Sequence, residues 1–420
     1  MEGSQMKKTP VRTLVDLLRW RAETEGERTA YIFLPDGETE GERATFAELD
    51  ARARRIAVGL RQLGLSGERA VLLYPPGPTY VAAFFGCLYA GVVAVPAYPP
   101  RNNRGLPRIK SIMDDSGAVI AMTSSSVVSR MRKMFDSLPE LAVTELFVTD
   151  DLQEGLEDEW VPPEINENSL AFLQYTSGST GTPKGVMLSH ANLLHNSGLI
   201  QQAFGTTEND RGVIWLPPYH DMGLIGGLLH PIYVCAESVL MPPAAFLQRP
   251  MRWLEAISKY GATVSGGPNF AYELTAKKAI EEEIEKLDLS AWRVAFNGAE
   301  PVRAETLELF SSTFERAGFS PRAHYPVYGL AEATLIVTGG TESDGPKVVV
   351  FDKKGLEQRR AAVAENGEAG RELVGCGAAL GDQKLAIVDP ETSRECKSGE
   401  IGEVWVHGPS VAQGYWRRPE

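Results

Sequence analysis

The sequence has few cysteines, few histidines and no excess of basic residues. Its four cysteines, Cys87, Cys235, Cys376 and Cys396, are far apart and form no CxxC pair, and its six histidines include no HExxH motif. The common zinc motifs are therefore absent, and reduced thiols together with an N-terminus lacking an apolar signal core favour a cytoplasmic protein. The 42 lysines and arginines against 55 acidic residues give a formal net charge of −13. This balance argues against nucleic acid as a partner.

Long hydrophobic runs are also scarce, and only Tyr80–Tyr98 approaches the length that crosses a membrane, with 19 uncharged residues. Glycines and a proline interrupt the run. We therefore predict a buried helix over Tyr80–Ala90 that Gly91 ends, followed by a buried strand over Val92–Val95. No membrane span is expected.

The rest of the sequence predicts alternating strands and helices. Thr45 and Glu48 have the spacing of a capping box, apolar residues recur on one face of the following helix, and Gly64 ends it. Further strands are predicted at Ala70–Tyr74, Val119–Thr123, Glu145–Thr149, Ala171–Tyr175, Val213–Leu216 and Ser238–Met241, and further helices at Leu188–Phe204, Met251–Tyr260 and Ala304–Ala317. Such alternation predicts an α/β fold with largely parallel sheets. A chain of 420 residues exceeds one ordinary core, so we expect subdomains.

The pattern changes near Gly339, which divides the chain into an α/β part at 1–338 and a β-rich part at 339–420. Short strands are predicted in the second part at Lys347–Phe351, Lys384–Val388 and Gly402–His407. A charged segment at about 342–372 is inserted there. Its apolar cluster Val348–Phe351 predicts that part of the segment packs against the protein.

The stretch YTSGSTGTPKG, from Tyr175 to Gly185, combines small residues, hydroxyls and Lys184. Small residues let backbone N–H groups approach a ligand, hydroxyls add donors, and a lysine supplies charge, which together suit a polyphosphate. Gly185 follows the lysine where a Walker A loop has Ser or Thr, so a P-loop ATPase or GTPase is disfavoured. The alternative is a mobile linker. Strand-like sequence on both sides of the loop favours the binding site.

Several motifs in order resemble those of the adenylate-forming enzymes, the superfamily of acyl-CoA synthetases, peptide-synthetase adenylation domains and luciferases. The glycine-rich stretch resembles the phosphate loop of the family, and four further motifs follow it: LPPYHDMGL at Leu216–Leu224, FNGAEP at Phe296–Pro301, YPVYGLAEAT at Tyr325–Thr334 and GEIGEVWVHGPSVAQGYW at Gly399–Trp416. The resemblance implies two mostly parallel sheets with flanking helices (two similar subdomains) and a smaller, barrel-like β-rich subdomain. It also implies that the C-terminal lid domain, with its catalytic lysine and the ribose aspartate, is absent. We therefore expect this chain to bind substrates but turn over poorly.

The resemblance assigns roles to individual residues, with ATP and Mg²⁺ as the implied cofactors. Lys184, Glu332 and His220 would be catalytic, with Glu332 the Mg²⁺ ligand and His220 the gate of the acyl pocket. ATP would contact Thr176, Ser177, Gly178, Ser179, Thr180, Gly181, Thr182, Lys184, Asn297, Gly298, Ala299, Glu300, Tyr328, Gly329, Leu330 and Ala331. The acyl substrate would contact His220, Asp221, Met222, Gly267 and Asn269.

Some of these assignments have alternatives. Glu332 alone would be read as a solvated helix glutamate, and His220 as a structural histidine. Asp221 would either pair with a substrate ammonium, as in amino-acid-activating relatives, or be structural, which we favour. Ala331 occupies a place where the family commonly has threonine, which puts one hydroxyl contact to phosphate in doubt.

The inserted segment resembles the insertion that distinguishes fatty acyl-AMP ligases from acyl-CoA ligases. This branch implies a fatty acid substrate and transfer of the acyl group to an acyl carrier protein of a polyketide or lipopeptide pathway. Alternatives are a long-chain fatty acyl-CoA synthetase, an amino-acid adenylation domain or, from another class, a non-catalytic acyl or nucleotide sensor. A serine hydrolase has little support, because the sequence lacks a GxSxG elbow.

Overall fold

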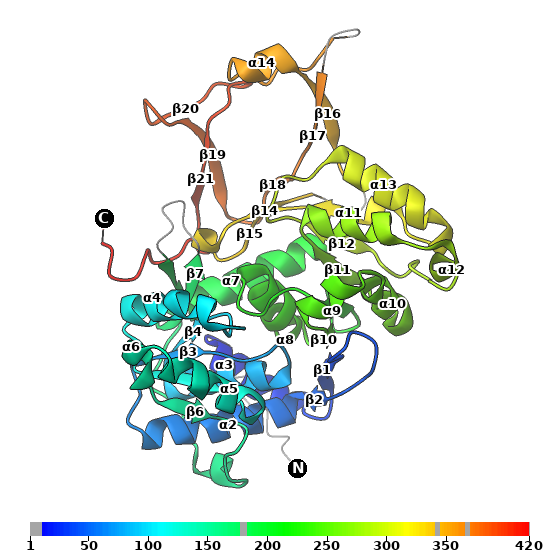
Figure 1. Ribbon diagram of the computed structural model, residues 1–420. Coiled ribbons are helices and arrows are strands. Elements are labelled where there is room, and N and C mark those ends of the chain that lie inside the picture. Colours follow the sequence, from blue (N-terminus) through cyan, green and yellow to red (C-terminus); the bar gives the residue numbers. More distant parts are fainter. Residues whose placement is uncertain (1–10, 177–182, 341–344, 366–369, 420) are drawn as a thin grey trace, which may run out of the picture.

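Two large sheets dominate the computed structural model, which describes residues 11–176, 183–340, 345–365 and 370–419 (Figure 1). The strands of the first are β3 (Arg69–Leu72), β4 (Val93–Pro96), β5 (Ile120–Thr123), β6 (Leu146–Val148), β7 (Leu170–Thr176) and β8 (Lys184–Ser189). Those of the second are β1 (Thr29–Phe33), β2 (Arg43–Thr45), β9 (Arg211–Ile214), β10 (Glu237–Leu240), β11 (Val264–Gly267), β12 (Val294–Asn297) and β13 (His324–Pro326). The strand order is β6-β5-β3-β4-β7-β8 in the first sheet and β13-β12-β11-β9-β10-β1-β2 in the second. All neighbours are parallel except β7–β8 and β1–β2, each at a sheet edge, which confirms the predicted α/β class.

Helices cover the faces of these sheets, as buried parallel strands require. They are α1 (Leu14–Thr24), α2 (Phe46–Gln62), α3 (Pro78–Ala90), α4 (Leu106–Ser116), α5 (Ser125–Asp136), α6 (Pro139–Ala142), α7 (His190–Phe204), α8 (His230–Val234), α9 (Pro243–Gln248), α10 (Met251–Tyr260), α11 (Asn269–Lys278), α12 (Glu281–Ile284) and α13 (Ala304–Phe314). The predicted capping box of α2 is confirmed, because Thr45 Oγ1 accepts from the Glu48 amide at 3.2 Å and the Glu48 carboxylate accepts from the Thr45 amide at 2.9 Å.

The uncharged run Tyr80–Tyr98 folds as predicted, with α3 ending before Gly91 and β4 following. Gly91 has φ 69°, the left-handed conformation that ends many helices. Nearly every side chain of α3 is buried, which explains why the run carries no charge. Across the described residues, no helix has the length and apolar character needed to cross a membrane.

Several predicted strand and helix ends differ from the structure by one to three residues, and the start of α7 also crosses from a strand into a helix. Helix α7 begins at His190 and not at Leu188, because Leu188 and Ser189 complete β8 and pair with β7. Ser189 then caps the helix, its hydroxyl accepting from the Asn192 amide at 3.2 Å. The apolar pattern of β8 continues into α7 without a break, so hydrophobicity alone does not mark the change.

Three small antiparallel sheets contain the strands from Tyr328 onward, so the first of them begins before the predicted boundary at 339, and in the described residues their strands do not close into one barrel. They contain β14 (Tyr328–Gly329), β15 (Ile336–Gly339) and β18 (Ala378–Ala379); β16 (Val348–Asp352) and β17 (Gly370–Val374); and β19 (Lys384–Asp389), β20 (Arg394–Glu395) and β21 (Glu403–His407). The middle pair, β16 and β17, with the short helix α14 (Lys353–Glu357), belongs to the inserted segment.

The inserted segment forms an arch rather than a buried cluster. Val348 and Val350 are 43% and 42% exposed, whereas the alternate residues Val349 and Phe351 are half-buried. Strand β17 lies beside α13. At the far end, the Ala361 amide donates to Gly399 O at 2.7 Å and the Ile401 amide to Arg359 O at 3.0 Å. Figure 1 shows the hairpin and the β19–β21 sheet rising above the large sheets and meeting near α14.

Candidate active site

The stretch predicted to bind phosphate lies between β7 and β8, which pair as antiparallel neighbours. Thr176 pairs with Lys184 where the loop leaves and re-enters the sheet. Six predicted contacts lie outside the described residues: Ser177, Gly178, Ser179, Thr180, Gly181 and Thr182. A side chain at Gly185 would place its Cβ 3.0 Å from the Tyr175 ring, which explains a glycine directly after the lysine. Tyr175 is fixed in turn, because its hydroxyl donates to Asp115 at 2.6 Å.

Glu332 lies on a strained turn. It is the middle residue of the 3₁₀ turn Ala331–Ala333, and Thr334 follows with φ 71° and ψ −66°. The Leu335 amide donates to Ala333 O at 2.9 Å, so residues 333–335 form a γ-turn of the rare, strained type. A β-branched residue at positive φ is unusual, and such strain is most often found at functional sites.

Tyr415 connects Lys184 to Glu332. The Lys184 ammonium lies 5.3 Å from the centroid of the Tyr415 ring, and the Tyr415 hydroxyl donates to Glu332 Oε1 at 2.5 Å. Burial and the bond to this carboxylate raise the pKa of Tyr415 to about 12, so the phenol stays protonated. Tyr415 lies near the end of the motif Gly399–Trp416, and the sequence pattern alone gives it no role.

The chemistry of Glu332 suits a Mg²⁺ ion that is shared with a nucleotide. In the described part of the chain, no cluster of three or more His, Cys, Asp or Glu side chains is placed to hold a metal. Mg²⁺ commonly takes one or two carboxylates and fills its remaining positions with phosphate oxygens and water. One carboxylate near Lys184 therefore fits the ion in the presence of ATP.

Asn297 has unpaired amide atoms on the predicted adenine side. It ends β12 and is 0% exposed, and neither its Nδ2 nor its Oδ1 has a hydrogen-bond partner among the described residues. Buried amides are almost always paired with protein, water or ligand. The next residues, Gly298 and Ala299, lead away from the sheet, with Ala299 at φ 68°. Glu300 is exposed, and its carboxylate accepts from the Phe270 amide at 2.6 Å.

The segment from Tyr328 to Ala331 also lies next to Glu332. Burial and, to a smaller extent, the nearby Glu332 charge raise the pKa of Tyr328. A Cβ at Gly329 would lie 1.8 Å from Leu335 O, so the β14–β15 hairpin itself requires this glycine. Leu330 is half-buried and Ala331 buried.

His220 and Asp221 form a pair at the start of a π-helix, Met222–Leu229. Asp221 Oδ1 is 2.6 Å from His220 Nδ1 and accepts from the Met222 amide at 2.7 Å. The bond to Asp221 raises the pKa of His220, while the His220 side chain remains 56% exposed. These contacts support the structural interpretation of Asp221.

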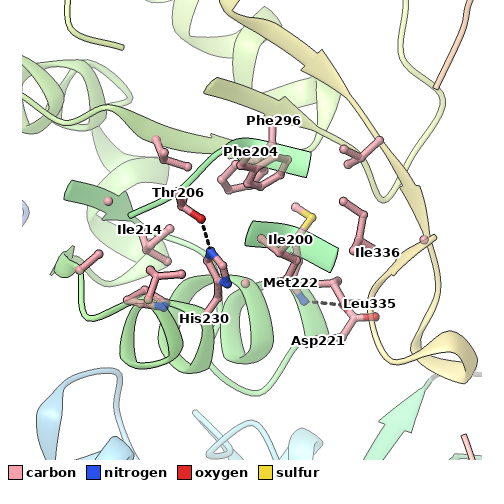
Figure 2. A pocket seen from close by; sticks show the side chains of 18 of the residues that line it. Ile200, Phe204, Thr206, Ile214, Asp221, Met222, His230, Phe296, Leu335 and Ile336 are labelled. Carbon is pink, nitrogen blue, oxygen red and sulfur yellow. Dashed lines mark hydrogen bonds between the residues drawn. The ribbon is translucent and has the colours of Figure 1, made fainter. Parts of the chain in front are cut away.

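A cavity of about 230 Å³ begins beside these residues (Figure 2). His220, Asp221, Met222, Tyr328, Gly329 and Ala299 line its near end. Its middle is apolar and is lined by Ile200, Phe204, Ile214, Val234, Phe296, Leu335 and Ile336. Secondary-structure elements far apart in sequence thus build one narrow apolar space, which suits an alkyl chain.

The far end of the cavity is polar but contains no unpaired charge among the described residues. Thr206 Oγ1 lies 2.8 Å from His230 Nε2, and burial lowers the pKa of His230 to about 3, so its ring is neutral. Asp210 accepts from Thr263 Oγ1 at 2.6 Å, and Arg211 pairs with Glu237. No sequence motif indicated these residues, because neighbouring elements bring them together.

Two predicted substrate contacts do not line this cavity. The buried Asn269 side chain donates to Thr306 Oγ1 at 3.1 Å and accepts from the Arg303 amide at 3.1 Å. Gly267 lies against the Trp215 ring. The structure therefore places both residues in the packing between β11, α11 and α13.

Replacing Asp221 with asparagine is expected to shift the titration of His220 to lower pH. The carboxylate stabilises the imidazolium, so its removal lets the ring lose its proton earlier as the pH rises. The His220–Asp221 pair also stabilises the folded protein at pH values below the raised pKa of His220, and this contribution is lost as the pH rises above that pKa. The effect on stability is small because His220 is half exposed. NMR titration of His220 measures the shift.

The matched control is Asp382→Asn, which removes the His195–Asp382 pair (2.9 Å), whose residues do not line the cavity. This change should leave the His220 titration in place. An unshifted His220 titration in the Asp221→Asn variant would contradict the role given to the pair.

Comparisons with known proteins agree with this geometry. The profile of the AMP-binding enzyme family matches residues 18–416. The medium-chain-fatty-acid–(acyl-carrier-protein) ligase JamA of Moorena producens (strain JHB) is 46% identical over 422 residues, covering 99% of this chain and 71% of the relative.

Solved structures are similar over the same length. A fatty acid AMP ligase from Legionella pneumophila superposes with a TM-score of 0.92 at 42% identity, covering 97% of this chain and 70% of that one. A fatty acyl-adenylate ligase from L. pneumophila in complex with acyl adenylate and pyrophosphate gives a TM-score of 0.91 at 43% identity, with the same coverage.

Proposed function

Because the chain belongs to the AMP-binding enzyme family, we propose that it activates a fatty acid with ATP for transfer to an acyl carrier protein. The products of the first step are an acyl-adenylate and pyrophosphate. The observation that carries the proposal is the apolar cavity, whose near end includes Tyr328 and Gly329, directly before the Glu332 turn. An alkyl chain in this cavity would place its carboxylate beside the nucleotide site.

The polar groups of the cavity favour a fatty acid over an amino acid. A substrate ammonium would need a free carboxylate, but Asp221 already binds His220 and the Met222 amide. Asp210, at the far end, accepts from Thr263 and pairs with Arg293 at 2.9 Å. The Moorena relative is named a fatty-acid ligase that acts with an acyl carrier protein, which supports the same substrate class and acceptor for this chain.

The site residues fit adenylation chemistry. A carboxylate oxygen of the fatty acid attacks the α-phosphorus of ATP, and the bond to the pyrophosphate oxygen breaks. Lys184 would stabilise the phosphate charge, Glu332 would hold Mg²⁺, and His220, whose pKa the bond to Asp221 raises, would face the substrate carboxylate. Bound Mg²⁺ supplies further neutralisation of the phosphates.

The experiment that tests the proposal uses a chain that also carries the C-terminal domain implied by the resemblance. It is incubated with labelled ATP, a panel of fatty acids and either CoA or a carrier protein, and acyl-AMP is then separated from acyl-CoA. Acyl-AMP with fatty acids, and acyl transfer to a carrier protein but not to CoA, is the expected result. Abundant acyl-CoA would favour the acyl-CoA synthetase alternative, and pyrophosphate exchange with amino acids would favour an adenylation domain.

Filling the cavity should shorten the preferred fatty acid. In this proposal the cavity holds the alkyl chain, so a side chain that fills part of it limits the length of chain that binds. Gly226 lines the cavity, and a Cβ there would lie 3.3 Å from Leu335 Cδ2. The variant Gly226→Leu should therefore favour chains about two to four carbons shorter, losing about fourfold in kcat/KM for each methylene excluded, at about 0.8 kcal/mol each.

The control for this variant is Gly198→Ala on α7, outside the cavity lining. It should keep the wild-type chain-length profile. If a folded Gly226→Leu protein also kept that profile, the cavity would not be the acyl site.

A further inference from the structure

The segment Ser410–Tyr415 holds the Glu332 turn at three points. Ser410 O accepts from the hydroxyl of Thr334, the strained residue, at 2.6 Å. The Ala412 amide donates to Glu332 O at 2.8 Å. The Tyr415 hydroxyl donates to Glu332 Oε1 at 2.5 Å. The backbone and the carboxylate of Glu332 are therefore both fixed by the same six residues.

The end of this segment also extends the sheet beside β8. The Met187 amide donates to Gly414 O at 2.9 Å, and the Trp416 amide donates to Gly185 O at 2.8 Å. Tyr415 itself stands opposite Val186 in an isolated bridge. Pairing with β8, which begins at Lys184, therefore fixes the position of Tyr415 along the sheet. This position places the Tyr415 ring beneath the Lys184 ammonium.

From this geometry we propose that Tyr415 is a positioning residue of the adenylation site, coupling the phosphate lysine to the metal carboxylate. The inference rests on the proposed function. Glu332 Oε1 is occupied by the Tyr415 hydroxyl, whereas Oε2 has no hydrogen-bond partner among the described residues. A carboxylate held by one oxygen presents the other in a fixed direction to a cation, and loss of such a partner commonly reduces metal affinity 10- to 100-fold.

The two ends of Tyr415 have separable roles. The hydroxyl acts on Glu332 and so affects binding that requires Mg²⁺. The ring supports Lys184 and so affects binding of the phosphates themselves, with or without the metal. Phenylalanine at this position removes the first contact and keeps the second, and leucine removes both.

The protein contains an internal control for these substitutions. On the surface, Lys259 Nζ lies 5.2 Å from the Tyr260 ring centroid, and the Tyr260 hydroxyl donates to Glu40 Oε2 at 3.1 Å. The trio repeats the chemistry of Lys184, Tyr415 and Glu332 at residues that line no part of the cavity. Tyr260→Phe therefore measures the cost of losing a Tyr–Glu bond without any effect on the site.

The test is equilibrium binding of ATP by calorimetry, without fatty acid so that no turnover occurs, once with excess Mg²⁺ and once with EDTA. Tyr415→Phe is expected to weaken binding of Mg·ATP about tenfold and leave binding of ATP in EDTA unchanged. Tyr415→Leu should weaken binding under both conditions, and Tyr260→Phe under neither.

Other outcomes overturn the inference. Wild-type or tighter binding of Mg·ATP by Tyr415→Phe would show that the Tyr415 hydroxyl does not contribute to binding. Equal loss with Mg²⁺ and with EDTA, together with a lower melting temperature, means a merely structural tyrosine. If the wild-type protein binds ATP under neither condition, the proposed function fails, a result distinct from failure of this inference.

Discussion

The variant Lys184→Ala is expected to lower the rate of acyl-adenylate formation about 10- to 150-fold, because it removes a charge-assisted contact to phosphate worth about 1.5–3 kcal/mol. Fold stability should hardly change. Lys184 is half-buried and its ammonium contacts the Tyr415 ring, an interaction worth only about 0.5–1 kcal/mol where solvent reaches it. The rate of adenylation and the melting temperature, measured on the same preparation, separate the two effects.

The matched control is Lys259→Ala, which removes an ammonium from the same kind of contact with Tyr260. It should cost a similar amount of stability and none of the activity. In parallel, Glu332→Gln should weaken the dependence on Mg²⁺ by a factor at least as large as that of Lys184→Ala, since a hard cation prefers a charged oxygen ligand. Both variants are measured in a chain that also carries the C-terminal domain, and full adenylation activity in both would show that the proposed site is wrong.

Much of the fold was predictable because local chemistry and tertiary structure agree. The capping box at Thr45 and the glycine at Gly91 mark helix ends directly, and the strands of the two large sheets are short apolar runs between turns. The resemblance to adenylate-forming enzymes is confirmed by the family match over residues 18–416. The start of α7 was misplaced because Leu188 is apolar in either a strand or a helix.

The geometry of the site was less predictable because it depends on contacts between distant segments. Tyr415 and Glu332 are 83 positions apart and meet only when the segment before Trp416 pairs with β8. The far end of the cavity likewise combines Thr206 with His230 from separate elements. A sequence motif indicates which residues belong to a site, but it does not show which of their atoms already form hydrogen bonds with neighbouring residues.

The arch changes how the inserted segment should be tested. Its cluster Val348–Phe351 was expected to anchor it by packing; two of its valines are exposed, and backbone hydrogen bonds to Gly399 and Ile401 attach the segment at its far end. Removing Val348–Ala364 would leave β17 without its partner β16. Deleting Val348–Val374 removes both strands of the hairpin together. The Gly375 amide donates to Lys347 O at 2.8 Å, so the two ends lie close and a short glycine link can join them.

Deleting the arch is expected to let acyl-CoA form while acyl-AMP formation continues. The arch lies beside α13 at one end and bonds to Gly399 and Ile401, just before β21, at the other. It would therefore hinder the movement of a C-terminal domain, such as the resemblance implies, during thioester formation. It lines no part of the acyl cavity, and distant changes usually act independently, so adenylation should stay within about twofold of the wild-type rate. The measurement is mass spectrometry of thioester products with CoA present, in a chain that also carries that domain.

A milder variant tests the mechanism behind the deletion. Ala361→Pro removes the amide that donates to Gly399 O and so detaches the arch at one end, which should yield a smaller amount of acyl-CoA. Polar replacement of Val349 and Phe351, which are half-buried in the β16–β17 hairpin, should yield less acyl-CoA than Ala361→Pro, because backbone hydrogen bonds attach the arch. No acyl-CoA from a folded, adenylating deletion variant would rule out obstruction by the arch. Abundant acyl-CoA from the unmodified protein would instead identify an acyl-CoA synthetase, in which the arch obstructs nothing.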